Sequence, residues 1–205
     1  MCLISLLQKA DYIELRKKIE EKGLLAYTEW YYLVHFLVTI ILFTILLGLI
    51  VYFNRWYVTV LLIVPLAFVT THFGYLGHDA GHRAVSKSNW INELAGHISY
   101  DLILGGSFSY WKYKHNKHHA DPNIQGIDPD IALTLFSLTE VRAMQKRGIK
   151  RWTTRIQAWL FPFVFPILLF SIRYDGYKYL IKKKGLVTDW ILLLSHVLLF
   201  FVIIP

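Results

Sequence analysis

The chain has 205 residues, of which 55% are hydrophobic and 16% aromatic, and its formal net charge is +8. This length and composition favour one membrane domain over two soluble domains. Cys2 is the only cysteine, which excludes a disulfide framework and a thiolate metal cage, so nitrogen and oxygen atoms must hold any metal. We assign the positive charge to surfaces that meet anionic lipid headgroups, and we expect no nucleic-acid partner.

Residues 1–31 are polar, with five basic and five acidic side chains, and they do not read as a signal peptide. They predict a short amphipathic helix near the membrane. Residues 32–53 are almost wholly apolar and would be about 33 Å long as a helix, enough to cross a bilayer core of roughly 30 Å. A second apolar run, residues 57–76, follows a three-residue polar link, so the two runs predict a hairpin with both ends on one side.

Residues 77–156 form a long polar segment, and two further apolar runs follow it. The first, residues 157–172, is short for a span and contains Pro162 and Pro166, which could break a helix. The second is residues 188–205. We favour four transmembrane helices, with the alternative that residues 157–172 are re-entrant or interfacial.

The distribution of basic residues predicts the orientation in the membrane. The polar segment carries 11 Lys or Arg residues, which places it and the N-terminus in the cytoplasm. The connector 173–187 is also basic, with five Lys or Arg, and it would lie outside if residues 157–172 cross the membrane fully. Its orientation is left open.

Five histidines form two clusters with helical spacing. His78 and His82 lie four residues apart in GHDAGH, and His115, His118 and His119 follow the pattern i, i+3, i+4 in HNKHH. Such spacing places the rings on one face of a helix, and neutral imidazole is the commonest metal ligand in proteins. A catalytic zinc site needs three protein ligands and an open position, so five histidines predict a site with more than one ion.

Side chains near the clusters are candidates for supporting roles. Asp79 and Asn116 stand beside ligands and could bond neighbouring ring nitrogens, which would fix the tautomers. His97 and His196 are possible additional ligands. His97 follows Gly96 between the two clusters, and His196 lies inside an apolar span, where an ionisable group is a functional candidate by default. For His196, a hydrogen bond to a backbone carbonyl is an equally good interpretation.

The ligand type narrows the chemistry. All-nitrogen sites suit zinc, iron, copper or nickel. Two irons bridged by oxygen can activate O2, and a membrane location points to a lipid substrate. His35 and His72 are expected to be structural, because His72 lies six residues before His78 and off its face.

The segments GHDAGH, WKYKHNKHHADPN and DPDI resemble the membrane fatty acid desaturase family, most closely its bacterial acyl-CoA and front-end branch. The similarity covers roughly residues 30–200, with strong motifs in residues 74–131. It implies an all-α integral membrane fold, with about four transmembrane helices and a cytoplasmic helical cap that bears the histidines. The N-terminal amphipathic segment, residues 1–31, would precede a membrane desaturase-like domain, residues 32–205.

The resemblance also implies an activity, the O2-dependent introduction of a cis double bond into a fatty acyl chain. The cofactor would be two non-haem iron ions, with O2 as co-substrate. The implied partners are a fatty acyl substrate carried on coenzyme A or a lipid, membrane lipid, and an external electron donor such as ferredoxin or cytochrome b5 with a reductase. The implied iron ligands are His78, His82, His115, His118 and His119, supported by Asp79, Asn116, Asp128 and Asp130.

The family's third histidine box, Gln-x-x-His-His in this branch, does not occur in the sequence. We therefore expect a C-terminally incomplete domain, with a downstream fragment carrying that box as a candidate partner. We also expect substoichiometric iron and no desaturase activity from residues 1–205 alone. Two alternatives stay open: a lipid hydroxylase of the same superfamily, and a non-catalytic truncated membrane protein that binds a metal or a partner chain.

Overall fold

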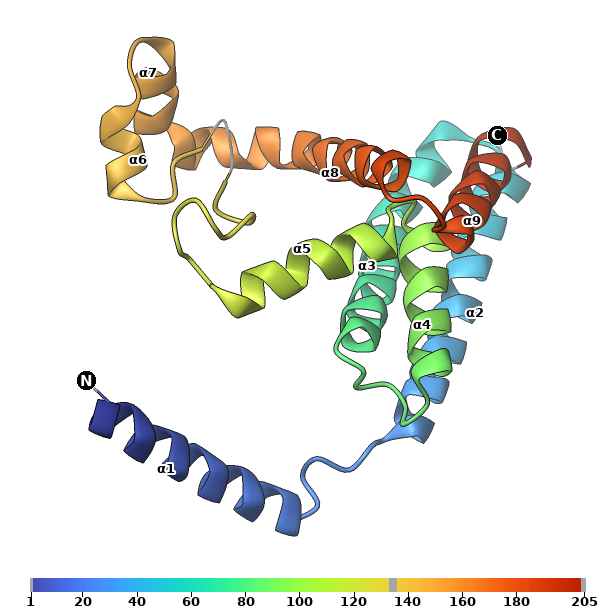
Figure 1. The fold of residues 1–205 in the computed structure, drawn as a ribbon. Coiled ribbons are helices and arrows are strands. Elements are labelled where there is room, and N and C mark those ends of the chain that lie inside the picture. The colour runs from blue at the N-terminus through green and yellow to red at the C-terminus, as the bar shows by residue number, and fades with distance from the viewer. Residues whose placement is uncertain (1, 133–135, 204–205) are drawn as a thin grey trace.

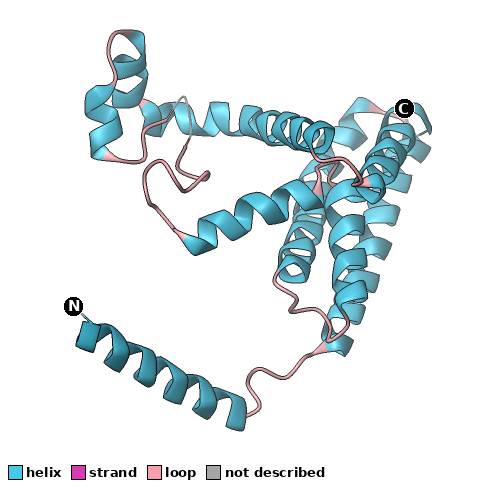
Figure 2. Ribbon diagram, viewed as in Figure 1, coloured by secondary structure: helices cyan, strands magenta, loops and turns pink. Residues whose placement is uncertain are grey.

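A computed structural model describes residues 2–132 and 136–203, and every regular element within them is a helix (Figures 1 and 2). This confirms the predicted all-helical membrane fold. The elements are α1 (Cys2–Glu21), α2 (Glu29–Phe53), α3 (Trp56–Gly81), α4 (Asn89–His97), the π-helical segment η1 (Ile98–Ile103), α5 (Phe108–Ala120), α6 (Glu140–Gln145), α7 (Ile149–Arg155), α8 (Gln157–Lys182), α9 (Val187–Leu198) and the π-helical segment η2 (Leu199–Ile203).

Helices α2 and α3 form the expected hairpin. Asn54 ends α2 in the left-handed conformation, with φ of 45°, and its N–H bonds the carbonyl of Ile50 at 3.0 Å. The interface between the two helices is apolar, and Phe43 and Phe73 meet edge to face with ring centroids 5.6 Å apart. Both helices are long and apolar enough to cross a membrane, and most of their side chains face outward, as expected for helices surrounded by lipid.

Helix α8 corrects the expectation of an interrupted segment. It runs unbroken from Gln157 to Lys182 through Pro162 and Pro166. The expected connector 173–187 therefore shrinks to four residues, because residues 173–182 are helical. A proline removes one backbone hydrogen bond, but a full break in apolar surroundings would leave several more backbone groups without partners. A continuous helix therefore costs less free energy than a broken one.

Within the described residues, α8 is the third helix long and apolar enough to span a membrane, and the shorter apolar stretch Val187–Phe201 follows it. The fourth apolar run expected from the sequence is thus present, although residues 204–205 of it lie outside the described part. Figure 1 shows α8 running across the α2–α3 hairpin rather than alongside it. A first half of α8 that lies at the membrane interface would have this direction, so this alternative stands beside a full span.

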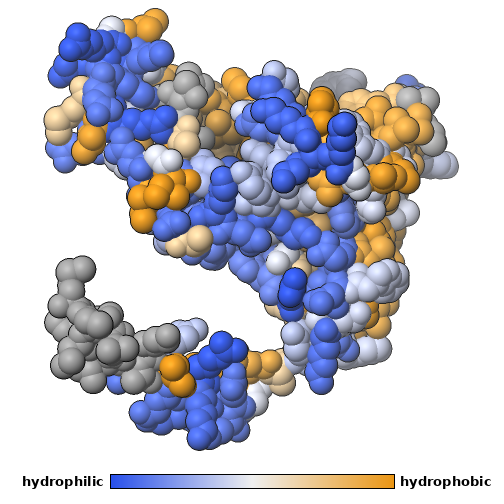
Figure 3. Space-filling view, viewed as in Figure 1, coloured by the Kyte–Doolittle hydropathy of each residue, from blue (hydrophilic) through white to orange (hydrophobic). Residues whose placement is uncertain are grey.

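The segment α4–η1 returns along α3 and brings the chain to the start of α5. Asn92 orders the loop before α4, since its side-chain oxygen accepts from the N–H of Val85 and Ser86 at 3.2 and 3.3 Å. Helix α9 packs against η1. Figure 3 shows hydrophobic side chains gathered on the side of α2 and α9, and hydrophilic side chains over α5, α6 and α7.

Candidate metal centre

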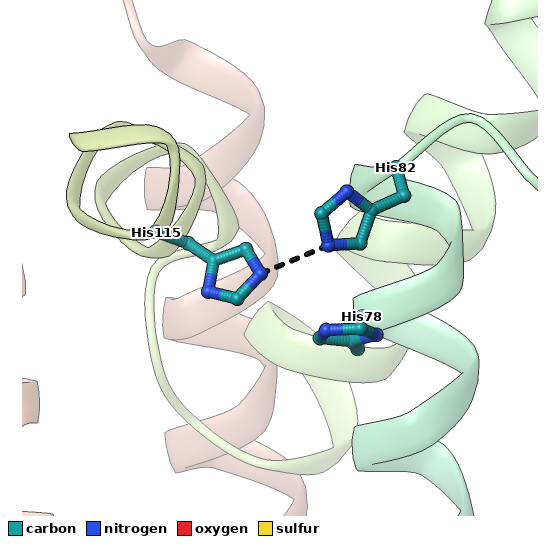
Figure 4. Close-up of side chains that lie close together, drawn as sticks. All are labelled: His78, His82 and His115. Carbon is teal, nitrogen blue, oxygen red and sulfur yellow. Dashed lines mark hydrogen bonds between the residues drawn. The ribbon is translucent and has the colours of Figure 1, made fainter. Parts of the chain in front are cut away.

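The two histidine clusters meet at the C-terminal end of α3. His78 lies in the last turn of α3 and His82 follows directly after it, while His115 and His119 lie one turn apart on α5. The Nε2 atoms of His82 and His115 are 2.9 Å apart (Figure 4). Those of His119 and His115 are 3.0 Å apart. The ring of His78 completes the group, with its centroid 4.6 Å from His82 and 5.0 Å from His115.

The donor atoms of this group fit a transition-metal ion. His78, His82 and His115 each offer a ring nitrogen within 4.8 Å of the others. Two imidazole nitrogens bound to one tetrahedral ion at about 2.1 Å would be roughly 3.4 Å apart. The observed Nε2 separations are close to that value, so a small rotation of the rings would admit an ion.

Two of the rings, those of His82 and His115, are held in the form that binds metals. Burial, followed by the neighbouring His119, His78 and His82, lowers the pKa of His115 to about 4. Burial and the neighbouring His78 and His119 also lower the pKa of His82. Both imidazoles are therefore neutral at pH 7, and neutral imidazole is the ligating form.

His118, also on α5, faces carboxylates of the segment that follows this helix. Its Nδ1 lies 2.8 Å from Oδ2 of Asp128, which is fully buried, and 3.6 Å from Oδ2 of Asp130. Burial alone would raise the pKa of Asp128, but hydrogen bonds from the backbone N–H of Asn123 and Asp130 and from His118 lower it. Asp130 also forms an ion pair with Lys114, with Nζ and Oδ1 2.6 Å apart. With Nδ1 bonded to Asp128, Nε2 of His118 is the nitrogen left for a ligand.

Asp79 supports His78 in the same manner. Its Oδ1 lies 3.1 Å from Nδ1 of His78, and its Oδ2 accepts from the hydroxyl of Tyr32 at 3.0 Å. A carboxylate on the far nitrogen of a ligating histidine fixes its tautomer and orientation. Asn116 is exposed, and no hydrogen bond joins it to a ring nitrogen in the described part of the chain.

The remaining histidines lie away from this group. His97 packs its Nδ1 against the buried carboxylate of Asp101, and Nδ1 of His196 lies 2.8 Å from the carbonyl oxygen of Leu102. His35 and His72 pair with each other across the hairpin, with ring nitrogens 3.2 Å apart. Neither candidate additional ligand, His97 or His196, is brought to the four clustered rings.

Two contacts of this site were not predicted from the sequence. Tyr32 lies 47 positions from Asp79, and nothing in the sequence pairs them. Trp111 stacks on His115, with centroids 4.3 Å apart and planes at 20°. Its position four residues before His115 on a helical pattern could have indicated this contact.

Helices that cross a membrane and histidines that converge at the end of one of them define a membrane protein with a candidate nitrogen-ligated metal centre. The sequence profile described as "Fatty acid desaturase" matches residues 54–205. The chain belongs to the fatty acid desaturase family.

Individual relatives carry the same name. A Delta(5) fatty acid desaturase of Caenorhabditis elegans is 27% identical over 164 residues, 78% of this chain and 36% of the relative. The Fatty acid desaturase 2-like protein FADS2B of Mus musculus is 29% identical over 88% of this chain and 39% of the relative. The sn-1 oleoyl-lipid 12-desaturase of a Picosynechococcus strain is 40% identical over 86 residues, 40% of this chain and 23% of the relative.

The chain thus spans well under half the length of each of these three relatives, between 23% and 39%. No solved structure matches the chain at the level at which these relatives do.

Proposed function

We propose that the chain supplies part or all of the active site of a fatty acyl desaturase, which introduces a cis double bond into an acyl chain at the expense of O2. The observation that carries the proposal is the convergence of His78 and His82 from α3 with His115 and His119 from α5. The family membership and the apolar helices beside the cluster support a lipid substrate.

The overall reaction defines what the protein must provide. Removing two hydrogens from adjacent methylenes and reducing O2 to two waters consumes two further electrons and two protons. A pair of ferrous ions would supply the reduction of O2 when bound. These electrons have to be supplied, so an external electron donor such as ferredoxin or cytochrome b5 with a reductase belongs to the proposal.

The chain's own residues would hold and shield the metal. His78, His82, His115, His118 and His119 would supply ring nitrogens to the metal, and Asp79 and Asp128 keep Nδ1 of His78 and His118 occupied. Trp111 covers one face of the His115 ring and excludes water there. The exposed residues of α5 between the histidines are polar, which suits the proposed cytoplasmic side of the membrane.

The test combines metal analysis with product analysis. The chain is expressed in a host that lacks the corresponding desaturase, and acyl chains are profiled by mass spectrometry. One arm uses the chain alone, and a second adds the segment encoded directly downstream. His115→Ala serves as the matched control, since it removes the imidazole at the centre of the cluster.

New cis-unsaturated acyl chains in either arm, absent with His115→Ala, would support the proposal. Hydroxylated acyl chains would instead assign a hydroxylase of the same superfamily. Stoichiometric iron without any modified acyl chain in either arm would argue for a non-catalytic membrane metal-binding protein.

A further inference from the structure

Two glycines of the first histidine segment face aromatic rings. Gly77 and Gly81 lie four residues apart on α3. A methyl group at Gly81 would overlap Cζ3 of Trp111, and a methyl group at Gly77 would overlap Cδ2 of Tyr100. Because neither glycine has a side chain, both rings pack directly against the backbone of α3.

These rings belong to a stack that ends at the histidine cluster. Tyr100 and Trp111 have centroids 4.9 Å apart, and the Trp111 ring continues onto His115 at 4.3 Å. The same indole lies 5.6 Å from the ring of His78 on the opposite helix. Trp111 therefore contacts a histidine of each cluster and also the backbone between His78 and His82.

The other two glycines of α2 and α3 have more open surroundings. A methyl group at Gly74, one turn before Gly77 on α3, would meet Cδ1 of Leu104 at 3.9 Å, an ordinary contact. A methyl group at Gly48 on α2 would meet nothing within 4 Å. On α2 and α3 the tight contacts thus fall on the two glycines nearest the histidines. Elsewhere in the described residues, Gly96 packs as closely against the ring of Phe108 and Gly105 against that of His196.

The anchoring of α5 explains why such a spacer is needed. Oδ1 of Asp101 accepts from the N–H of Phe108 at 2.7 Å, and Oδ1 of Asp189 accepts from Ser107 at 2.6 Å. These contacts fix the first turn of α5, and the Lys112–Glu93 ion pair and the Tyr113–Tyr179 ring contact hold the next turn to α4 and α8 rather than to α3. Trp111 comes one turn later and is the side chain that separates α5 from α3 just before His115.

We infer that Trp111, seated in the notch at Gly81 and backed by Tyr100 in the notch at Gly77, is a positioning residue that sets the spacing of α3 and α5 for metal binding. The inference rests on the proposed metal-binding function and adds residues that are not ligands. Widening this spacing would move His115 and His119 away from His78 and His82. The Nε2 separation of His82 and His115, now 2.9 Å, would then grow, because it crosses from one helix to the other. The 3.0 Å separation of His119 and His115 lies within α5 and would stay the same.

The decisive variant is Gly81→Ala, assayed by titrating Co²⁺ alone into the purified chain in lipid nanodiscs. The visible absorption of Co²⁺ reports its coordination as well as its affinity. We expect affinity to fall at least tenfold, in the range of about 10–100-fold that loss of a residue supporting the ligands typically costs. Alanine is a better helix former than glycine, so the loss would not come from a weaker helix. Gly74→Ala is the matched control and should bind like the parent.

A double variant distinguishes a change in helix spacing from a general loss of folded structure. Trp111→Phe removes the outer atoms of the indole that would meet the new methyl group. In the Gly81→Ala background it should restore most of the lost affinity and the parent absorption spectrum. Alone, Trp111→Phe leaves a void beside His115 and should weaken Co²⁺ binding while the helical circular dichroism stays unchanged.

The possible outcomes distinguish a failure of the proposed function from a failure of this inference. A parent chain that does not bind Co²⁺ would overturn the proposed function and this inference with it. Equal affinity of the parent and Gly81→Ala, or no recovery in the double variant, would overturn the inference alone. If Gly81→Ala does not fold, Trp111→Phe carries the test, and unchanged affinity in that variant would count against the inference.

Discussion

The hydroxyl of Tyr32 on α2 donates a hydrogen bond to Oδ2 of Asp79 on α3 at 3.0 Å. The other oxygen of the same carboxylate lies 3.1 Å from Nδ1 of His78. The first apolar helix is therefore connected to the histidine cluster through a single carboxylate. This contact leaves Nε2 of His78 as the nitrogen available to a metal.

Asp79→Ala should weaken metal binding about 10–100-fold, because the His78 ring would lose the partner that fixes its tautomer. Tyr32→Phe should have a smaller effect, about fivefold, which corresponds to one hydrogen bond of roughly 1 kcal/mol. Isothermal titration with Co²⁺ measures both. Tyr31→Phe is the control, since Tyr31 is the exposed neighbour of Tyr32. If Tyr32→Phe and Tyr31→Phe bind alike, the hydrogen bond has no bearing on the site.

Asp128 is the counterpart of Asp79 for the second cluster. It accepts from the N–H of Asn123 at 2.7 Å and of Asp130 at 2.8 Å, and Nδ1 of His118 lies 2.8 Å from it. Asp128→Asn keeps the volume but removes the charge, so the His118 ring should be held less firmly.

We expect Asp128→Asn to lower the affinity of the ion that His118 binds by about 10–100-fold. Elemental analysis after dialysis against a weak chelator would show less retained metal than in the parent chain. Asp121→Asn, at the C-terminal end of α5, is the control and should retain the parent amount of metal. Full metal retention by Asp128→Asn would mean that His118 is not a ligand.

Local patterns in the sequence were sufficient for some parts of the site. The i, i+4 spacing placed His115 and His119 on one face of a helix, and the two apolar runs with a short link predicted the α2–α3 hairpin. Both depend only on helix periodicity and on length relative to a bilayer.

The parts that could not be predicted depend on tertiary register. Tyr32 reaches Asp79 only because the hairpin aligns the start of α2 with the end of α3. The continuity of α8 through Pro162 and Pro166 is decided by its apolar surroundings rather than by proline propensity. The sequence could not separate His97 and His196 from the ligands, because their partners, Asp101 and the carbonyl of Leu102, are set by the packing around η1.

His196 offers a test of that separation. Its Nδ1 lies 2.8 Å from the carbonyl oxygen of Leu102, and its ring lies against Gly105, whose φ is +66°. His196→Ala should leave the Leu102 carbonyl without its partner and destabilise the fold by about 1–3 kcal/mol. Thermal unfolding in detergent would show the loss, while the metal content stays that of the parent. A lost metal ion in this variant would instead make His196 a ligand.

Asp101 gives a prediction for the pH dependence of stability. Its side chain is fully buried, with His97 against one oxygen and the N–H of Phe108 against the other. Burial raises the pKa of Asp101 to about 6, and the nearby Asp189 adds to this. Burial lowers the pKa of His97, but Asp101, Asp189 and Glu93 together outweigh burial and raise it.

Both raised pKa values stabilise the fold at low pH. The folded chain holds these protons more tightly than the unfolded chain does. The stability that this tighter binding contributes is therefore fully present below about pH 4. It is lost as the pH rises, first through the raised pKa of Asp101 near 6 and then through that of His97. Asp101→Asn removes the first contribution and much of the second, because His97 loses its charged partner.

We therefore expect the unfolding temperature of the parent chain to exceed that of Asp101→Asn by more at pH 5 than at pH 8. The measurement uses metal-free protein in a nonionic detergent, where the clustered histidines titrate equally in both chains and cancel in the difference. Glu93→Gln is the comparison, because Glu93 is half-exposed, lies 3.8 Å from His97 and is the weakest of the three carboxylates that raise the pKa of His97. Its difference from the parent should therefore change less with pH than that of Asp101→Asn. A difference between the parent and Asp101→Asn that is constant or grows toward pH 8 would show that Asp101 is not held protonated by burial. In that case the His97–Asp101 contact would be an ordinary ion pair, with the depressed carboxyl pKa that such a pair brings.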